Sequence, residues 1–339
     1  MPNNPTKILL STTLIGGILI SISSNSWLGA WMGLEINLMS IIPIMSSQEN
    51  IYTNEASLKY FLVQALASTT LLFLVMMKFL MNQMIITGSS HSYAIMTPLL
   101  MKMGAAPLHW WFPSVMEGLS WMNCLLMMTV QKIAPMILTS YLLKMNPPTL
   151  SIVLMSVLAG SVGGMNQTSL RKILTYSSIN HTGWMLMALM GGNNLWTMYF
   201  MIYSLLTSTV TVVAKSFNIS FVNQTNLVNK SAAIKFLLFT TLLSLGGLPP
   251  FIGFLPKWTV IQLLIMNNLS FMMATMVVAS LVTLYFYLRL SYSSFMILNE
   301  ETKWSAWSNT KNMSITYGVI FSSASMMGLL MSTLIANIN

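Results

Sequence analysis

Long apolar stretches that carry no charged residue dominate the chain. Each is longer than the roughly 20 residues that a helix needs to cross the hydrocarbon core of a bilayer. The stretches are apolar throughout, whereas the strands of a membrane barrel alternate apolar and polar residues. The pattern therefore predicts transmembrane helices. The five clearest stretches separate Lys7 from Glu35, Lys144 from Arg171, Lys235 from Lys257, Lys257 from Arg289, and Lys311 from the C-terminus.

Polar breaks between the apolar stretches predict an all-α polytopic membrane protein with about eleven transmembrane helices. The predicted helices cover residues 5–23, 26–45, 55–80, 91–113, 118–143, 149–166, 171–191, 195–217, 232–267, 270–298 and 313–335.

Two of these helices, the fourth and the ninth, contain residues that interrupt a helix. The fourth contains a Gly-Ala-Ala-Pro sequence at 104–107, and the ninth contains Gly-Gly-Leu-Pro-Pro at 246–250. Proline has no N–H to donate and clashes with the preceding turn. We therefore predict that both helices are broken at these points.

The position of the two broken helices suggests an internal repeat. Helices one to five and six to ten form two sets, and the fourth member of each set is broken, which is typical of inverted repeats in transporters. A repeat with an odd number of helices inverts its second copy. We predict one transmembrane domain over 1–339, made of a first five-helix repeat at 5–143, a second at 149–298 and a C-terminal helix at 313–335.

The distribution of cations orients the chain in the membrane. Ten of the 15 Lys and Arg residues fall on the side that holds the N-terminus, two fall on the other side, and three lie within the membrane. Positively charged loops stay on the inner face. The N-terminus is therefore predicted inside and the C-terminus outside.

Composition excludes several classes of protein. Charged residues make up 6% of the chain, against about 25% in soluble domains. One cysteine and three histidines are too few for zinc fingers, iron–sulfur clusters or a disulfide scaffold. A net charge of +9 can indicate nucleic-acid binding, but here the cations are scattered among apolar stretches. We predict no metal site and no nucleic-acid partner.

Four charged residues lie deep within predicted helices: Glu35, Lys102, Lys132 and Lys257. Glu35 is roughly 14 Å from either end of its helix. Lys102 comes just before the first break, Lys257 follows the second, and Lys132 is near the centre of the fifth helix. Charges at this depth cost several kcal/mol each and usually mark ion or proton pathways. We predict that all four take part in function.

Two further residues each allow two interpretations. Glu117 is nearer a helix end, where it is either an interfacial charge or a group for proton uptake. His181 lies in a Ser/Thr-rich stretch at the centre of the seventh helix. It is either an interhelical hydrogen-bonding group or a proton relay.

Proton transfer is the chemistry that these residues favour. Lysine, glutamate and water exchange protons where burial disfavours a charged lysine. Moving the Glu35 carboxylate relative to Lys102 would switch the protonation of that lysine. Broken helices suit this chemistry, because their free backbone groups are tolerated in a membrane only where they line a cavity.

Five segments carry a family resemblance: Gly33–Asn37, Lys102–Pro113, Gln131–Pro135, Asn166–Ile179 and the Leu-Pro-Pro segment that leads to Lys257. Together they resemble the antiporter-like chain 2 subunits of respiratory complex I (NADH–ubiquinone oxidoreductase) that animal mitochondria encode. The resemblance extends from about residue 5 to residue 295.

The resemblance implies two inverted five-helix bundles, in an antiporter-like fold that lacks its first three helices. It implies that Glu35 pairs with Lys102, that Lys132 connects the two halves, and that Lys257 stands at the output end. It also implies a translocase that couples NADH oxidation and ubiquinone reduction to proton translocation.

The same resemblance implies which groups and partners surround the chain. This chain would hold no cofactor, because NADH, FMN, the iron–sulfur clusters and ubiquinone bind to other subunits. Its partners would be other membrane-arm subunits, including neighbouring antiporter-like subunits, and inner-membrane lipids. The N-terminus would face the mitochondrial matrix and the C-terminus the intermembrane space.

Two alternatives remain open at this point. A cation/proton antiporter of related fold would need carboxylates and carbonyls for sodium, and a chain with one central Glu and no Asp is poor in such ligands. A structural spacer subunit would need the deep charges only for stability.

Overall fold

The computed structural model describes residues 5–47, 50–81, 88–222, 224, 232–292 and 323, and its regular structure is helical. The chain divides into two compact units between Ile152 and Val153. The predicted helix at 313–335 lies outside the described residues, apart from Ser323.

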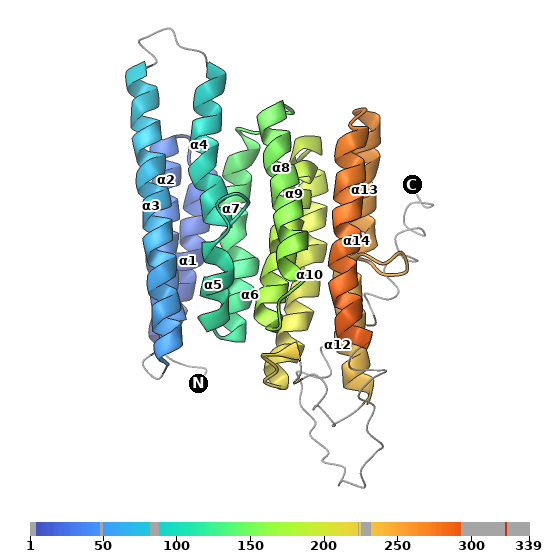
Figure 1. Cartoon of the computed structure of the whole chain (residues 1–339). Helices are drawn as coiled ribbons and strands as arrows, with labels where there is room; N and C mark the ends of the chain where they lie inside the picture. The colour runs from blue at the N-terminus through green and yellow to red at the C-terminus, as the bar shows by residue number, and fades with distance from the viewer. Residues whose placement is uncertain are drawn as a thin grey trace. The chain divides into compact units, whose positions relative to one another are not determined.

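The first unit contains seven helices and the start of an eighth (Figure 1). They are α1 (Pro5–Ser23), α2 (Trp27–Met45), α3 (Ile51–Met81), α4 (Gly88–Met103), α5 (Trp111–Gly118), α6 (Trp121–Met128), α7 (Val130–Ser140) and α8 (Pro147–Gly164).

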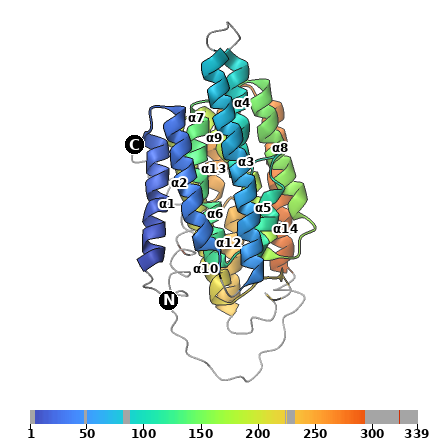
Figure 2. The ribbon, with the colours of Figure 1, turned by 90° about the vertical axis from the view of Figure 1, so that its left-hand side faces the viewer.

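The first two helices meet backbone to backbone. Figure 2 shows α1 and α2 side by side. A Cβ atom added to Gly33 would lie 2.5 Å from the Ser21 nitrogen and 2.8 Å from the Gly17 oxygen. Small residues allow this close approach, which is typical of helix pairs in membranes. Glycine is therefore required at this crossing, which fixes α2 and the functional residues that it carries.

The predicted break in the fourth helix is confirmed. Its two halves, α4 and α5, both pack along α3 (Figure 1). They are 16 and 8 residues long, so neither half reaches the roughly 20 residues that cross a bilayer core. Between them, residues 104–106 are buried and bring irregular backbone to the interior of the unit, while the following residues up to Trp110 are more exposed.

The second unit contains the rest of α8 and five described helices. They are α9 (Leu170–Gly191), α10 (Asn193–Ser216), α12 (Ala232–Gly246), α13 (Phe254–Met266) and α14 (Ser270–Tyr292). The predicted break in the ninth helix is also confirmed, because α12 and α13 are separate segments of 15 and 13 residues that both pack against α14.

One difference from the prediction concerns the fifth helix, expected as one helix over 118–143. The structure has two segments, α6 and α7, that meet at Thr129 with φ −114° and ψ −77°. Farther along, Pro135 cannot donate to the carbonyl of Gln131. The sequence therefore shows a proline that weakens the helix at Pro135, but it has no proline or glycine near the interruption at Thr129.

Seven spans within the described part of the chain are long and apolar enough to cross a membrane: Pro5–Ser23, Trp27–Met45, Ile51–Lys78, Trp121–Ser140, Pro147–Gly164, Asn193–Ser216 and Ser270–Tyr292. Each half of the two broken helices is too short to cross a membrane alone, so none of these halves is among the seven spans. The structure thus supports a polytopic membrane protein, while the count of eleven helices stays a prediction.

Candidate functional site

The first helix break closes with a Schellman motif at the end of α4. Gly104 adopts φ +71° and donates its N–H to the Met101 oxygen over 3.2 Å. Ala105 donates to the Leu100 oxygen over 3.0 Å. This pair of hydrogen bonds satisfies two carbonyls that a helix end leaves without partners, and the positive φ explains why glycine stands there.

Lys102 lies in the last turn of α4 and is buried, with 7% of its surface exposed. Its backbone carbonyl accepts a hydrogen bond of 3.4 Å from the Gln64 side chain of α3. Its ammonium makes no hydrogen bond with any described residue. The Glu35 carboxylate, half-buried on α2, acts on Lys102 through its charge. The two side chains do not come within the 4.0 Å of a salt bridge, so the expected pairing is a longer-range electrostatic interaction.

The second helix break closes with the same motif at the end of α12. Gly247 adopts φ +83° and donates to the Ser244 oxygen over 3.0 Å. Leu248 donates to the Leu243 oxygen over 3.4 Å. Both broken helices therefore end in the same way, and a glycine with positive φ makes each ending possible.

Lys257, on the first turn of α13, is 3% exposed. Its ammonium donates hydrogen bonds to the carbonyls of Gly246, at 2.8 Å, and Leu245, at 3.5 Å. It also lies 6.0 Å from the centre of the Trp184 ring. Lysine near a helix C-terminus satisfies free carbonyls and interacts favourably with the helix dipole. The Lys257 ammonium is thus held by the end of α12.

Lys132 is the most deeply buried of the three candidate lysines Lys102, Lys132 and Lys257, with 2% of its surface exposed. Its ammonium lies 5.2 Å from the centre of the Phe112 ring, on the first turn of α5. A Cβ atom on Gly104 would come within 3.2 Å of the Phe112 side chain. Phe112 therefore connects Lys132 with the first helix break through a cation–π contact.

Polar residues that the sequence reasoning missed surround Lys102. The Asn37 and Gln131 side-chain amides exchange two hydrogen bonds of 3.1 and 3.0 Å. Tyr60 donates a third, of 3.2 Å, to the Gln131 oxygen. Their closeness in sequence to charged residues could have pointed to two of them, since Asn37 follows Glu35 by two residues and Gln131 directly precedes Lys132.

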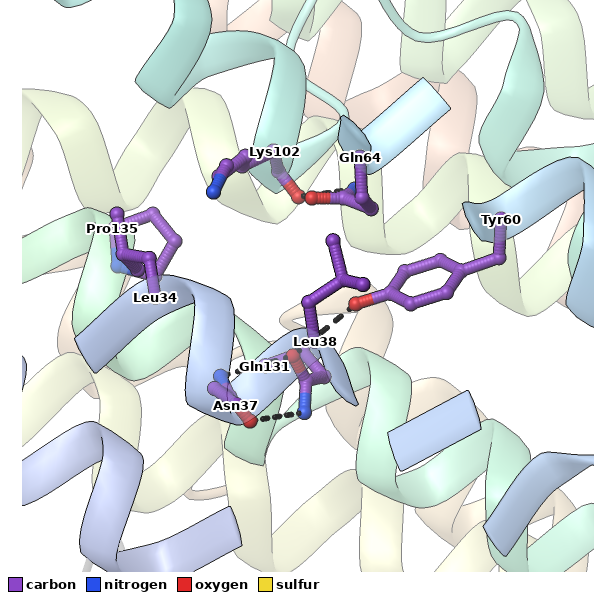
Figure 3. A pocket seen from close by; sticks show the side chains of 8 residues that line it. All are labelled: Leu34, Asn37, Leu38, Tyr60, Gln64, Lys102, Gln131 and Pro135. Carbon is purple, nitrogen blue, oxygen red and sulfur yellow. Dashed lines mark hydrogen bonds between the residues drawn. The ribbon is translucent and has the colours of Figure 1, made fainter. Parts of the chain in front are cut away.

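These side chains line a small cavity of about 10 Å³. In Figure 3, Lys102 and Gln64 lie above it and the Asn37–Gln131 amide pair lies below. A space of this size, measured for the centre of a water-sized sphere, is close to the minimum that holds one water molecule. The cavity is lined by Leu34, Asn37, Leu38, Tyr60, Gln64, Lys102, Gln131 and Pro135.

The two residues that allowed two interpretations, His181 and Glu117, lie in different surroundings. His181 is buried in the second unit, and its Nδ1 forms a 2.9 Å hydrogen bond with the Tyr199 hydroxyl. Its ring also packs against Tyr203, with centroids 5.1 Å apart. Glu117 is exposed near the end of α5. Both interpretations of each residue therefore stay open.

Within each unit, the arrangement places buried ionisable groups beside interrupted helices. The first unit contains Glu35, Lys102 and Lys132, of which Glu35 and Lys102 interact through their charges, while the second contains Lys257 and His181. Groups of three or more His, Cys, Asp or Glu side chains that could hold a metal are absent from the described residues. Lysines and a carboxylate in this setting can gain and lose protons.

Comparisons with known proteins agree with this chemistry. Residues 24–283 match the family described as NADH:quinone oxidoreductase/Mrp antiporter, TM. The chain is 52% identical over 326 residues to NADH-ubiquinone oxidoreductase chain 2 of Anopheles gambiae, covering 95% of each chain. It is 40% identical over 322 residues to the protein of the same name in Loxodonta africana, covering 91% of this chain and 92% of that one.

Solved structures resemble the fold. A chain of respiratory complex I from Thermus thermophilus with bound aureothin superimposes with a TM-score of 0.84 at 23% identity, covering 98% of this chain and 80% of that chain. A chain of the Mrp complex from Dietzia gives a TM-score of 0.80 at 14% identity, covering 96% and 75%. At these identities, the likeness establishes the fold.

Proposed function

This chain belongs to the family of NADH-ubiquinone oxidoreductase chain 2, and we propose that Glu35, Lys102, Lys132 and Lys257 carry its protons. The chain is a proton-translocating membrane subunit of respiratory complex I, and a multi-pass protein of the mitochondrial inner membrane. It is a component of the proton-translocating NADH:ubiquinone oxidoreductase.

One observation carries the proposal about the residues. Each of the three lysines is at most 7% exposed and lies beside an interruption of a helix. Burying a lysine in a membrane is costly, and such residues usually belong to ion or proton pathways. At Lys257 the interrupted helix supplies backbone carbonyls to the ammonium, which a continuous helix would not.

The remaining parts of the proposal concern the surroundings of the chain. We infer eleven transmembrane helices in two inverted five-helix repeats, with the N-terminus in the matrix and the C-terminus in the intermembrane space. NADH, FMN, the iron–sulfur clusters and ubiquinone bind to other subunits. The reaction at those groups drives protonation changes here through contacts with neighbouring membrane-arm subunits. Inner-membrane lipids cover the rest of the apolar surface.

The test uses complex I assembled with variant chains in sealed inner-membrane vesicles. Lys102→Ala and Glu35→Ala are expected to lower proton pumping and the coupled quinone reductase rate, while the complex still assembles. Lys59→Ala is the control, because Lys59 pairs with Glu55 at the exposed end of α3, and exposed ion pairs contribute little. Unchanged pumping per electron in both test variants contradicts the proposal.

The same vesicles test the antiporter alternative. Pumping is measured at several sodium concentrations with the proton gradient held fixed. Proton translocation without sodium exchange predicts no dependence on sodium. A pumping rate that rises with sodium would favour cation/proton exchange instead.

A further inference from the structure

The small cavity beside Lys102 has the size and the polar lining of a water-binding site. Its volume of about 10 Å³ suits one water molecule and little else. Polar side chains of α2, α3 and α7 line it together with Lys102 at the end of α4. A polar cavity of this size is where a bound water satisfies buried groups.

The Lys102 ammonium needs hydrogen-bond acceptors that a water molecule would provide. Its ammonium has three hydrogens to donate, is 7% exposed, and donates to no described residue. A buried ammonium whose hydrogens lack acceptors is destabilising, and Glu35 acts on this one from beyond salt-bridge distance. Lys257 has no such need, because the end of α12 accepts its hydrogen bonds. At the end of α4, the carbonyl that corresponds to Leu245 is that of Lys102, which accepts from the neutral Gln64. The Lys102 side chain lines the cavity and finds no carbonyl acceptor among the described residues.

The opposite wall of the cavity is a closed hydrogen-bonded network. The Gln131 oxygen accepts from both Asn37 and Tyr60, and the Gln131 nitrogen donates back to Asn37. The three residues come from three different helices. Buried hydrogen bonds between helices restrain the spacing of the helices that carry them, and three such bonds join α2, α3 and α7 here. This network therefore sets the width of the cavity.

We propose that Asn37, Gln131 and Tyr60 are positioning residues that keep a space for one water molecule beside the Lys102 ammonium. The inference rests on the proposed role of Lys102 in proton translocation. The water accepts a hydrogen bond from the ammonium and donates to the polar wall. It keeps Lys102 hydrated in an otherwise apolar interior, so that the lysine exchanges its proton in each turnover.

The test removes the network without changing its shape. Gln131→Met and Asn37→Leu replace amides by apolar groups of similar size, and Tyr60→Phe removes one oxygen and keeps the ring. In complex I assembled with these chains, we expect pumping to fall about fivefold, as for loss of one hydrogen bond. High-resolution electron microscopy should show one water within hydrogen-bonding distance of Lys102 Nζ, and its loss in Gln131→Met.

Controls separate positioning from general stability. Asn123→Leu removes an amide of α6 that binds the Ile44 oxygen away from the cavity, and should leave pumping unchanged. The double exchange Asn37→Gln with Gln131→Asn restores an amide pair and should recover pumping.

If the variants pump normally while Lys102→Ala fails, the positioning role is wrong and the proposed function stands. If Lys102→Ala also pumps normally, the proposed function itself fails. An unmodified complex without water at Lys102 overturns the inference.

Discussion

The Lys257 ammonium donates a hydrogen bond of 2.8 Å to the carbonyl oxygen of Gly246. Gly246 is the last residue of α12 and Lys257 lies in α13, so this bond joins the two halves of a broken helix. Positive charge is favourable at a helix C-terminus. The geometry of the break and the charge on the lysine are thus linked, and substitutions at the break should affect proton transfer.

Gly247→Ala should impair proton pumping more than it impairs folding. The added Cβ would lie 2.9 Å from Lys257 Cδ and 3.0 Å from Nζ, at a residue with φ +83°. Displacing the ammonium breaks its bond with Gly246, and the strained backbone costs roughly 1–2 kcal/mol. The measurement is pumping per electron in vesicles alongside the thermal stability of the complex.

Gly192→Ala provides the matched control for that variant. Gly192 also has a positive φ, of +132°, but its Cβ would meet nothing within 4 Å. It should lose stability and keep its pumping stoichiometry. Equal losses of pumping in the two variants would mean that backbone strain alone explains the effect.

Phe112→Leu should weaken the function of Lys132 while leaving the helix break in place. The substitution removes the ring that lies 5.2 Å from the Lys132 ammonium. A buried cation–π contact contributes about 1–2 kcal/mol, so we expect a pumping rate reduced about 5- to 30-fold. Phe112→Tyr, which keeps the ring face, should retain most of the rate. A normal rate in Phe112→Leu would show that the aromatic ring has no electrostatic role.

His181→Asn distinguishes the two roles left open for this histidine. Asparagine offers an amide to the Tyr199 hydroxyl, which now bonds His181 Nδ1 at 2.9 Å, but it does not take up protons near neutral pH. A purely structural histidine predicts near-normal pumping in His181→Asn. A relay predicts a large loss of pumping in His181→Asn, with Tyr199→Phe less affected. The pumping rate of each variant, measured at equal amounts of assembled complex, decides between them.

Gly33→Ala should destabilise the first unit by about 1–3 kcal/mol, as overpacking usually does. Its Cβ would lie 2.5 Å from the backbone nitrogen of Ser21, and backbone cannot move aside as a side chain can. Gly16→Ala on the facing helix α1 is the control, because its Cβ would meet nothing within 4 Å. Resistance of the two variant chains to thermal unfolding in detergent gives the comparison. Equal resistance would contradict the tight crossing of α1 and α2.

Much of the fold could be predicted because the membrane restricts what the backbone can do. Apolar stretches located the helices to within a few residues in most of the described chain, and the breaks followed from Pro107 and Pro249. The interruption at Thr129 was not predictable in this way. Residues 126–132 contain no proline or glycine that would mark it.

The candidate site was predicted in part, because charge within an apolar stretch is a strong local signal. Burial of the three lysines was confirmed by their exposed fractions, while their roles in proton transfer stay a prediction. Neutral residues of the site were missed, because Asn37 and Gln131 are 94 positions apart in sequence. A hydrogen bond between distant residues becomes visible only when the helices are assembled.

The contact of α1 with α2 has a mechanical consequence. Since the backbones touch at Gly17 and Gly33, neither helix can slide along the other without a collision. Any shift of α2 that accompanies a change at Glu35 must therefore carry α1 with it. The outward side of α1 presents large exposed apolar side chains such as Ile8 and Leu19. A change of charge at Glu35 that moves α2 would therefore also move the exposed apolar surface of α1, together with any molecule that contacts it.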